Sequence, residues 1–201
     1  MNERREILIR EMFKIPKDFA LEVIDYLVEQ DEFEEREFRF VEWDGCGFAV
    51  GTENSDFYNP YSILYVPKNM ANDGEYEQIS HKFFLDYFKN YGLDWRRIKY
   101  KYDMNFYQIY TMIGILHEMG HVIDGDKQIE KYGWLKRLYN DKTTKYCKTS
   151  LMTFEESLKY YRTIPCEERA DKLAIELFNR HEEEMIKRFK QLEIEYEAVN
   201  L

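Results

Sequence analysis

The chain has 201 residues, of which 44% are hydrophobic, 17% aromatic and 34% charged, with a formal net charge of −10. This length suffices for one domain with a substantial core, and the negative charge argues against general binding to nucleic acid. No apolar run approaches the length of a membrane span, and the N-terminus lacks a signal-peptide pattern. Cys46, Cys147 and Cys166 form an odd, scattered set, typical of free thiols in a reducing compartment. We therefore expect one cytoplasmic domain over residues 1–201.

The N-terminal part of the chain predicts helices followed by a small sheet. Amphipathic patterns over 4–14 and 17–30 predict two helices, interrupted at Pro16. The charge run Asp31–Glu37 predicts a solvated connection. A Gly45-Cys46-Gly47 turn then favours a mainly antiparallel sheet. Its predicted strands are Phe38–Trp43, Phe48–Gly51 and Ser62–Val66.

The rest of the chain is predicted to be largely helical. Residues 76–91 have an aromatic helical face, whereas Arg96–Tyr102 alternates basic with apolar or aromatic residues and predicts an edge strand. That basic patch is too short, in an acidic chain, to favour nucleic-acid binding. Further helices are predicted over 105–124, 127–141, 153–161 and from Pro165 to about 197. The expected fold class is helix-rich α+β, with N-terminal helices and sheet over about 1–103 and a second group of helices over about 104–201.

The most informative stretch is His117-Glu118-Met119-Gly120-His121, inside the helix predicted over 105–124. Asp103 or Asn105 can cap this helix, and Gly125 offers a stop. Histidines four residues apart lie on one helical face, so both rings can reach one metal ion. Glu118 between them can accept a proton from the water that such a metal activates. A chance pair of surface histidines is the alternative, but the apolar context favours a bound partner.

Apolar residues recur at three- and four-residue steps along this helix, which predicts one stripe facing the core. The stripe consists of Phe106, Ile109, Ile113, Leu116 and Gly120.

A catalytic zinc takes three protein ligands and leaves one position for water, so a third ligand is needed. The helix that begins at Pro165 carries Glu167 in its first turn, where the helix dipole favours an ionised carboxylate. Asp171, one turn later, can accept a hydrogen bond from the free ring N–H of a liganding histidine. Alone, the two acids read as an ordinary acidic first turn. Coupled to the histidine motif, they favour a metal site.

At these residues the chain resembles a family. HExxH followed by ExxxD on a second helix is similar to the gluzincin metallopeptidases. The form Glu167-x-x-Ala170-Asp171, preceded by Ile164-Pro165, resembles the ImmA/IrrE-type and related small phage and bacterial metallopeptidases. The resemblance covers two helices, about 40 of 201 residues. It implies a zincin-like domain with a HExxH active-site helix.

For the site, the resemblance implies Zn²⁺ on His117, His121 and Glu167, Glu118 as the general base, and Asp171 supporting the ligands without binding the metal. We expect no cofactor besides zinc. A segment of 45 residues separates His121 from Glu167, and no histidine is evident for stabilising an oxyanion. Any tyrosine between the two motifs could serve instead, although each is more typical of core or rim. These tyrosines are Tyr132, Tyr139, Tyr146, Tyr160 and Tyr161.

The function that these residues predict is zinc-dependent hydrolysis of a polypeptide substrate. The alternative is a non-catalytic structural or interaction protein, for example a virion-associated or regulatory one, that retains a zincin fold. Glu118 favours the enzyme, because a purely structural site has no use for a general base. We expect no membrane partner and no nucleic acid, and leave the oligomeric state open. The expected location is the cytoplasm, or the host cytoplasm or virion for a phage-encoded protein.

The two remaining histidines are not expected to bind the metal. His181 is predicted to lie on the solvated surface, and His81 to be a packing residue.

Overall fold

The computed structural model of the chain describes residues 16–32, 37–43, 48–51, 63–67, 83–132 and 153–199. Several sequence predictions lie outside these residues. They are the helix over 4–14, the Gly45-Cys46-Gly47 turn, His81 with the first part of the helix over 76–91, and the segment 133–152.

The core is built around α5 (Phe106–Tyr132), the helix that carries the histidine motif. Asn105 caps its start, because the Asn105 side chain accepts a hydrogen bond from the Gln108 N–H at 3.0 Å and the Gln108 side chain accepts from the Asn105 N–H at 2.6 Å. The burial is wider than the predicted stripe, since Met112, Ile115 and Met119 on other faces are also buried. A helix buried on nearly all sides is central to its domain.

The prediction that α5 ends near Gly125 was wrong, because the helix passes through Gly125 and continues to Tyr132. A glycine inside a helix costs only about 1 kcal/mol relative to alanine. The flanking turn buries Val122 and Ile123, and its buried carboxylate Asp124 accepts from Arg169 Nε at 2.7 Å. These tertiary contacts outweigh the weak local preference for a stop.

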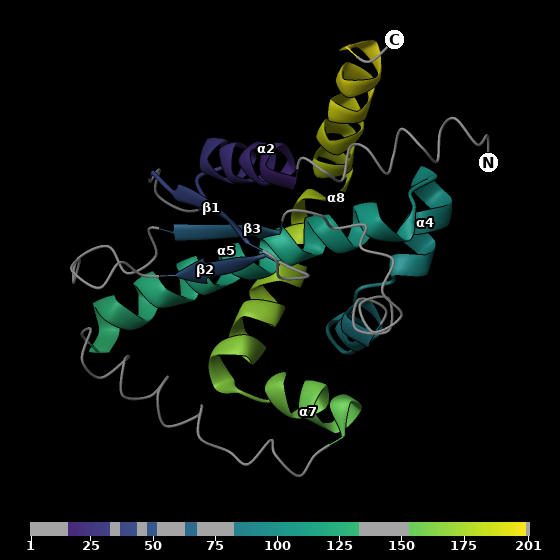
Figure 1. Ribbon diagram of the computed structural model, residues 1–201. Helices are drawn as coiled ribbons and strands as arrows, with labels where there is room; N and C mark the ends of the chain where they lie inside the picture. The colour runs from purple at the N-terminus through teal and green to yellow at the C-terminus, as the bar shows by residue number, and fades with distance from the viewer. Residues whose placement is uncertain are drawn as a thin grey trace.

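The long helix α8 (Pro165–Val199) packs more extensively against α5 than any other described element does. Figure 1 shows α8 rising from its start near α7 (Phe154–Tyr161), crossing α5 and extending toward the C-terminus. At the crossing the two backbones come very close: a Cβ on Gly120 would lie 2.6 Å from the carbonyl oxygen of Ala170. The absence of a side chain at Gly120 therefore sets the distance between the two helices that carry the predicted site.

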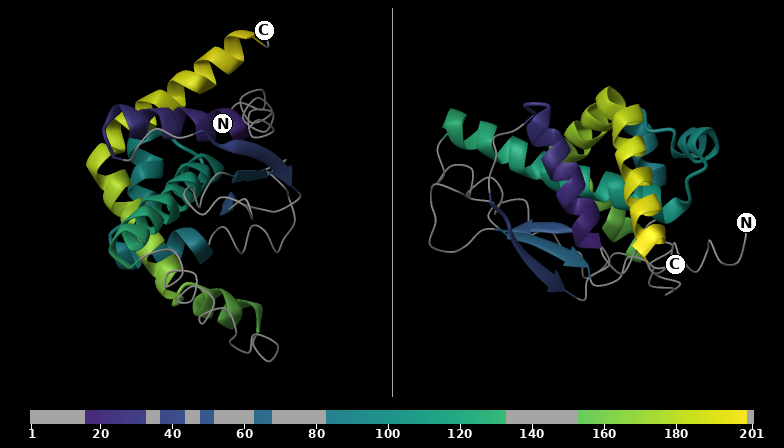
Figure 2. Two further views of the ribbon diagram at one scale, coloured as in Figure 1. Left: turned by 90° about the vertical axis from the view of Figure 1, so that its left-hand side faces the viewer. Right: turned by 90° about the horizontal axis from the view of Figure 1, so that it is seen from above.

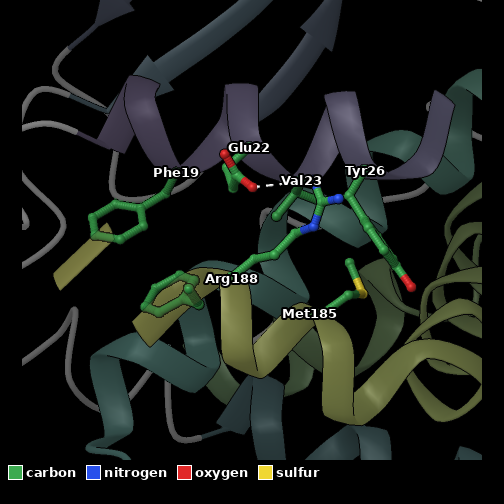
Figure 3. A pocket seen from close by; sticks show the side chains of 7 residues that line it. Phe19, Glu22, Val23, Tyr26, Met185 and Arg188 are labelled. Carbon is green, nitrogen blue, oxygen red and sulfur yellow. Dashed lines mark hydrogen bonds and ion pairs between the residues drawn. The ribbon is translucent and has the colours of Figure 1, made fainter. Parts of the chain in front are cut away.

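A second helix, α2 (Pro16–Glu29), packs against both α5 and α8. Figure 3 shows the small space between α2 and α8. Phe19 and Phe189 both line it, and their rings stack with centroids 4.4 Å apart. Arg188 of α8 reaches across this space to Glu22 at 3.3 Å and lies over the ring of Tyr26. Its cavity volume is only about 10 Å³, so the interface is closely packed.

The prediction of a solvated His181 was wrong. α8 kinks at this residue (φ −118°, ψ 15°), and the side chain is largely buried against α2. Its Nδ1 lies 3.1 Å from the Tyr26 hydroxyl and its Nε2 lies 2.6 Å from Glu32. Glu32 also accepts from Arg180, so this part of the predicted Asp31–Glu37 solvated connection anchors α8 instead. The sequence hides this contact because its partners are about 150 residues apart.

The sheet consists of β1 (Arg39–Trp43), β2 (Ala49–Gly51) and β3 (Ile63–Pro67), in the order β1-β3-β2. β1 pairs with β3 in parallel over five positions, and β2 pairs with β3 antiparallel over three. The predicted strand segments are therefore confirmed, but the mainly antiparallel arrangement is wrong. β3 takes the central position because it is the most apolar strand, with four of its five residues buried. Figure 2 shows α5 running between this sheet and α8.

The predicted edge strand over Arg96–Tyr102 is instead the helix α4 (Trp95–Tyr102). Asp94 caps its start by accepting from the Arg97 N–H at 3.0 Å, and Asp103 ends it in the left-handed conformation (φ 51°). The alternating residue pattern led to the wrong prediction of a strand. Trp95 and Ile98, three residues apart, are the buried pair, whereas Tyr100 is 81% exposed. Helical spacing, and not a period of two, fits these exposures.

The remaining described helical residues are 83–87, which lead into the short 3₁₀ helix η1 (Phe88–Tyr91). Together the elements confirm a helix-rich α+β protein with a small sheet. Among the described residues, no helix combines the length and apolar character needed to cross a membrane.

Candidate metal and catalytic site

The motif residues lie in the middle of α5, where Gly120 closely approaches Ala170 in the first turns of α8. Figure 1 shows the two helices crossing. His117 and Glu118 are buried, and His121 is largely so. The two rings are 4.7 Å apart between centroids and nearly perpendicular, at 79°. The four-residue spacing therefore brings both imidazoles to the same place, as predicted.

Glu167 completes this group from α8. Its Oε2 lies 3.2 Å from Nε2 of His117 and 3.4 Å from Nε2 of His121. The possible ligand atoms of the three residues all lie within 4.8 Å of one another. The Glu167 carboxylate lies in the first turn of α8, where the helix dipole stabilises its negative charge. Among the described residues, this is the group of histidine, cysteine and acidic side chains that could hold a metal ion.

The spacing and the chemistry of this group both fit a divalent metal ion. Two ligands at 2.0–2.1 Å from a tetrahedral zinc lie about 3.3 Å apart, which matches the two distances from Glu167. The buried Oε2 of Glu167 has no hydrogen-bond partner in the described part of the chain. An unpaired buried carboxylate oxygen is costly, and a metal ion at this point would satisfy it. Two imidazoles and one carboxylate are also a ligand set that zinc accepts.

Asp171 lies on the far side of His117 from the proposed metal position. Its Oδ1 is 2.8 Å from Nδ1 of His117, although the ring N–H is not well aligned for a hydrogen bond. Asp171 is fully buried. Burial lowers the pKa of His117, but the neighbouring Asp171 and Glu167 outweigh it and raise this pKa to about 9. The structure therefore places Asp171 where the sequence predicted, and its supporting role stays a prediction.

Glu118 is held by the sheet. The backbone N–H of Val50 on β2 donates to Oε2 of Glu118 at 2.9 Å, and Oε1 lies 3.9 Å from Nε2 of His117. Burial and the nearby Glu167 raise the pKa of Glu118, whereas the two histidines and the Val50 N–H oppose this shift. The carboxylate is thus fixed beside the ligand group but outside it, which is the position that a general base requires.

The pKa of Glu167 shows how the group is balanced electrostatically. Burial alone would raise this pKa, but His117 and His121 interact with the carboxylate and lower it well below its ordinary value. Glu167 is therefore ionised, as a metal ligand must be.

Arg162, which the sequence reasoning missed, also belongs to the site. It lies in the turn between α7 and α8, and its Nη1 donates to Oδ1 of Asp171 at 2.9 Å. The same nitrogen is 3.5 Å from Nε2 of His117 and 3.9 Å from Oε2 of Glu167. Residues in turns follow no regular spacing, so the sequence pattern did not predict a role for Arg162. The one indication in the sequence is that Arg162 lies five residues before Glu167.

Tyr161, the last residue of α7, reaches the site as well. Burial, the charge of Glu167 and a hydrogen bond to that carboxylate raise the pKa of its hydroxyl. The side chain is 46% exposed. Of the tyrosines predicted as oxyanion candidates, Tyr139 and Tyr146 lie outside the described residues.

Comparisons of this chain with models of protein families, with curated proteins and with solved structures found no match in any of the three.

Proposed function

We propose that this protein is a zinc-dependent metallopeptidase of the gluzincin type, which hydrolyses peptide bonds in a polypeptide substrate. The observation that carries the proposal is one convergence of atoms. Nε2 of His117 and Nε2 of His121 lie 3.2 and 3.4 Å from a buried Glu167 oxygen that has no hydrogen-bond partner in the described part of the chain. Three protein ligands of this kind leave one coordination position for water or substrate, as in catalytic zinc sites.

His117, His121 and Glu167 are the residues that would hold the metal, with Asp171 fixing the His117 ring from behind. When bound, the metal supplies a Lewis acid that polarises the scissile carbonyl and acidifies the attacking water. Glu118 accepts a proton from that water as its oxygen forms a bond with the carbonyl carbon. Glu118 then returns the proton to the amide nitrogen as the C–N bond breaks, releasing an amine and a carboxylic acid.

The sheet supports an extended substrate in this scheme. β2 is at the end of the strand order and has the most contact with α5 of the three strands. The Val50 N–H, which donates to Glu118, points away from β3. In an antiparallel strand the N–H and C=O of one residue point to the same side, so the Val50 carbonyl also faces the site. A peptide lying along β2 would pass beside Glu118, in the mode of strand addition to a sheet edge.

Replacing Glu118 with glutamine tests the proposal. The amide keeps the shape of the side chain and its ability to accept from Val50, but it cannot take a proton. We expect Glu118→Gln to retain bound zinc and the same melting temperature, while hydrolysis of a proteome-derived peptide library falls by about 100- to 10,000-fold. The measurements are zinc content by metal analysis and cleavage products by mass spectrometry, on both forms prepared in parallel.

The alternative is a structural or interaction protein in which the same residues only hold a stabilising metal. It predicts that neither form cleaves any peptide, although both bind zinc. Absence of cleavage by both forms would reject the proposed peptidase activity. Equal cleavage by both forms would instead remove Glu118 from the mechanism.

A further inference from the structure

Arg162 places a positive charge within 4 Å of two of the three candidate metal ligands, His117 and Glu167. We propose that Arg162 is a catalytic residue, whose guanidinium donates to the substrate carbonyl oxygen and stabilises the negative charge that develops on it. This inference rests on the hydrolysis proposed above, and it assigns the oxyanion-stabilising group for that reaction.

The guanidinium is held rigidly. Its side chain is only 13% exposed, its Nη1 donates to Asp171 at 2.9 Å, and its central carbon lies 4.4 Å from the ring centroid of Phe84. The backbone is fixed too, because the Tyr87 hydroxyl donates to the Arg162 carbonyl at 3.2 Å. Groups that stabilise a transition state electrostatically are effective when they need no reorganisation during the reaction.

This guanidinium has donors that none of the described residues uses. Its hydrogen bonds within the described residues all involve Nη1, so Nε and Nη2 donate to none of them. An arginine has five N–H donors in a planar fork, which suits an oxyanion. A carbonyl oxygen that enters between the fork and the ligand group would receive these bonds as its charge grows.

Tyr161 is the competing candidate, but its side chain is 46% exposed, whereas that of Arg162 is only 13% exposed. A phenol is neutral and has a single O–H donor, so it could offer an oxyanion one hydrogen bond. Arg162 has two donor nitrogens that bond to none of the described residues, and it carries a full positive charge.

The charges around the site favour a cationic group. Glu118, Glu167 and Asp171 are three buried or nearly buried acids, and hydrolysis would place a further negative charge among them. Arginine side chains are effectively always charged in proteins. Arg162 is thus a fixed counter-charge that water at this position could not replace.

In this step the water oxygen bonds to the carbonyl carbon, the π electrons of the C=O bond move onto oxygen, and Glu118 takes the proton. Arg162 donates hydrogen bonds to that oxygen without transferring a proton. The electrons return when the C–N bond breaks and the amine leaves with the proton from Glu118. The guanidinium is unchanged at the end.

Arg162→Gln and Arg162→Lys test this role, with Arg169→Gln as the matched control. Arg169 also pairs with a buried aspartate between α8 and α5, Asp124, but it lies outside the ligand group. For Arg162→Gln we expect kcat to fall roughly 100- to 1,000-fold with little change in KM, as for the loss of an oxyanion donor. Arg162→Lys should be intermediate, because it keeps the charge without the fork. Arg169→Gln should retain activity within about threefold.

Two binding measurements separate this role from a structural one. Zinc affinity, measured by competition with a chelator, should be unchanged or higher in Arg162→Gln, since a positive charge near the metal is removed. A phosphinic analogue of the best-cleaved peptide, which mimics the transition state, should bind more weakly by the same factor as kcat/KM falls. Calorimetric titration of the zinc-loaded protein measures this directly.

Three results would overturn the proposal. Full activity in Arg162→Gln would exclude the role of Arg162 and leave the proposed hydrolysis standing. Zinc affinity and melting temperature that fall together with activity, in both Arg162 variants, would make Arg162 a support for Asp171. A wild-type protein that cleaves no peptide would reject the proposed function and this inference with it.

Discussion

Replacing Gly120 with alanine should separate metal binding from folding. The added Cβ would meet the Ala170 carbonyl oxygen at 2.6 Å and the Ala170 Cα at 3.0 Å, and these are backbone atoms that cannot rotate away. Opening the oxygen contact from 2.6 Å to an ordinary 3.4 Å requires α5 and α8 to move apart by about 0.8 Å. Metal–ligand distances tolerate only about ±0.2 Å. Glu167 and Asp171 flank Ala170 on α8, so they would move away from the histidines.

The cost to folding should be smaller. Overpacking of a core typically costs 1–3 kcal/mol, and alanine regains about 1 kcal/mol over glycine in a helix. We therefore expect Gly120→Ala to lose about 0–2 kcal/mol of unfolding free energy in the metal-free state, measured by denaturant titration. Its zinc affinity, measured by chelator competition, should fall by at least tenfold.

Gly114→Ala is the control on the same helix. Among the described residues, a Cβ there would meet only Phe48, at 3.6 Å, which is ordinary van der Waals contact. This variant should bind zinc as the wild type does and gain up to about 1 kcal/mol. Zinc affinity within twofold of wild type in Gly120→Ala, with unchanged stability, would refute the argument that close helix approach sets the ligand geometry.

Three further changes probe the site and its support. His117→Ala should abolish stoichiometric zinc, seen by metal analysis, and should remove the increase in melting temperature that zinc gives the wild type. Asp171→Asn should weaken zinc binding or activity by roughly 10- to 100-fold with the helix content intact, measured by chelator titration and circular dichroism; a change within twofold would make Asp171 a mere structural acid. At Glu32, burial raises the pKa but His181 and Arg180 outweigh it and lower the pKa, so its contribution to stability is present above pH 4.5 and is lost as pH falls further. Glu32→Gln should therefore destabilise the protein at pH 7 and differ less from wild type near pH 3 in thermal unfolding; an equal difference at both pH values would contradict this.

The sequence predicted those parts of the site that depend on local spacing. His117 and His121 share a face because helices repeat every 3.6 residues, and Glu167 follows a proline that begins a helix. Both helices are long enough for their periodicity to be unambiguous. The carboxylate and the two histidines could then be paired through the known ligand preference of zinc.

Long-range contacts were not predictable in this way. The parallel pairing of β1 with β3 depends on strand order, which no local pattern encodes. α4 was misread because a short run of alternating residues fits a strand as well as a helix, and only the burial of Trp95 and Ile98 decides. Arg162 reaches the site from the turn between α7 and α8, and no local pattern predicts where such a turn places its side chains. The hydrogen bond from Val50 to Glu118 joins residues 68 apart in the sequence.

The hydrogen bond between Val50 and Glu118 allows the assembly of the site to be followed by hydrogen exchange. The Val50 amide proton is bonded to a side chain of α5, so it is protected from exchange with solvent only while β2 and α5 are in contact. Neighbouring ladder amides instead report on the sheet alone. The exchange rate of the Val50 amide therefore measures how often Glu118, the proposed general base, loses its hydrogen bond to β2. Because the contact closes a long loop, we expect it to form late in folding and to open before the core of α5 does.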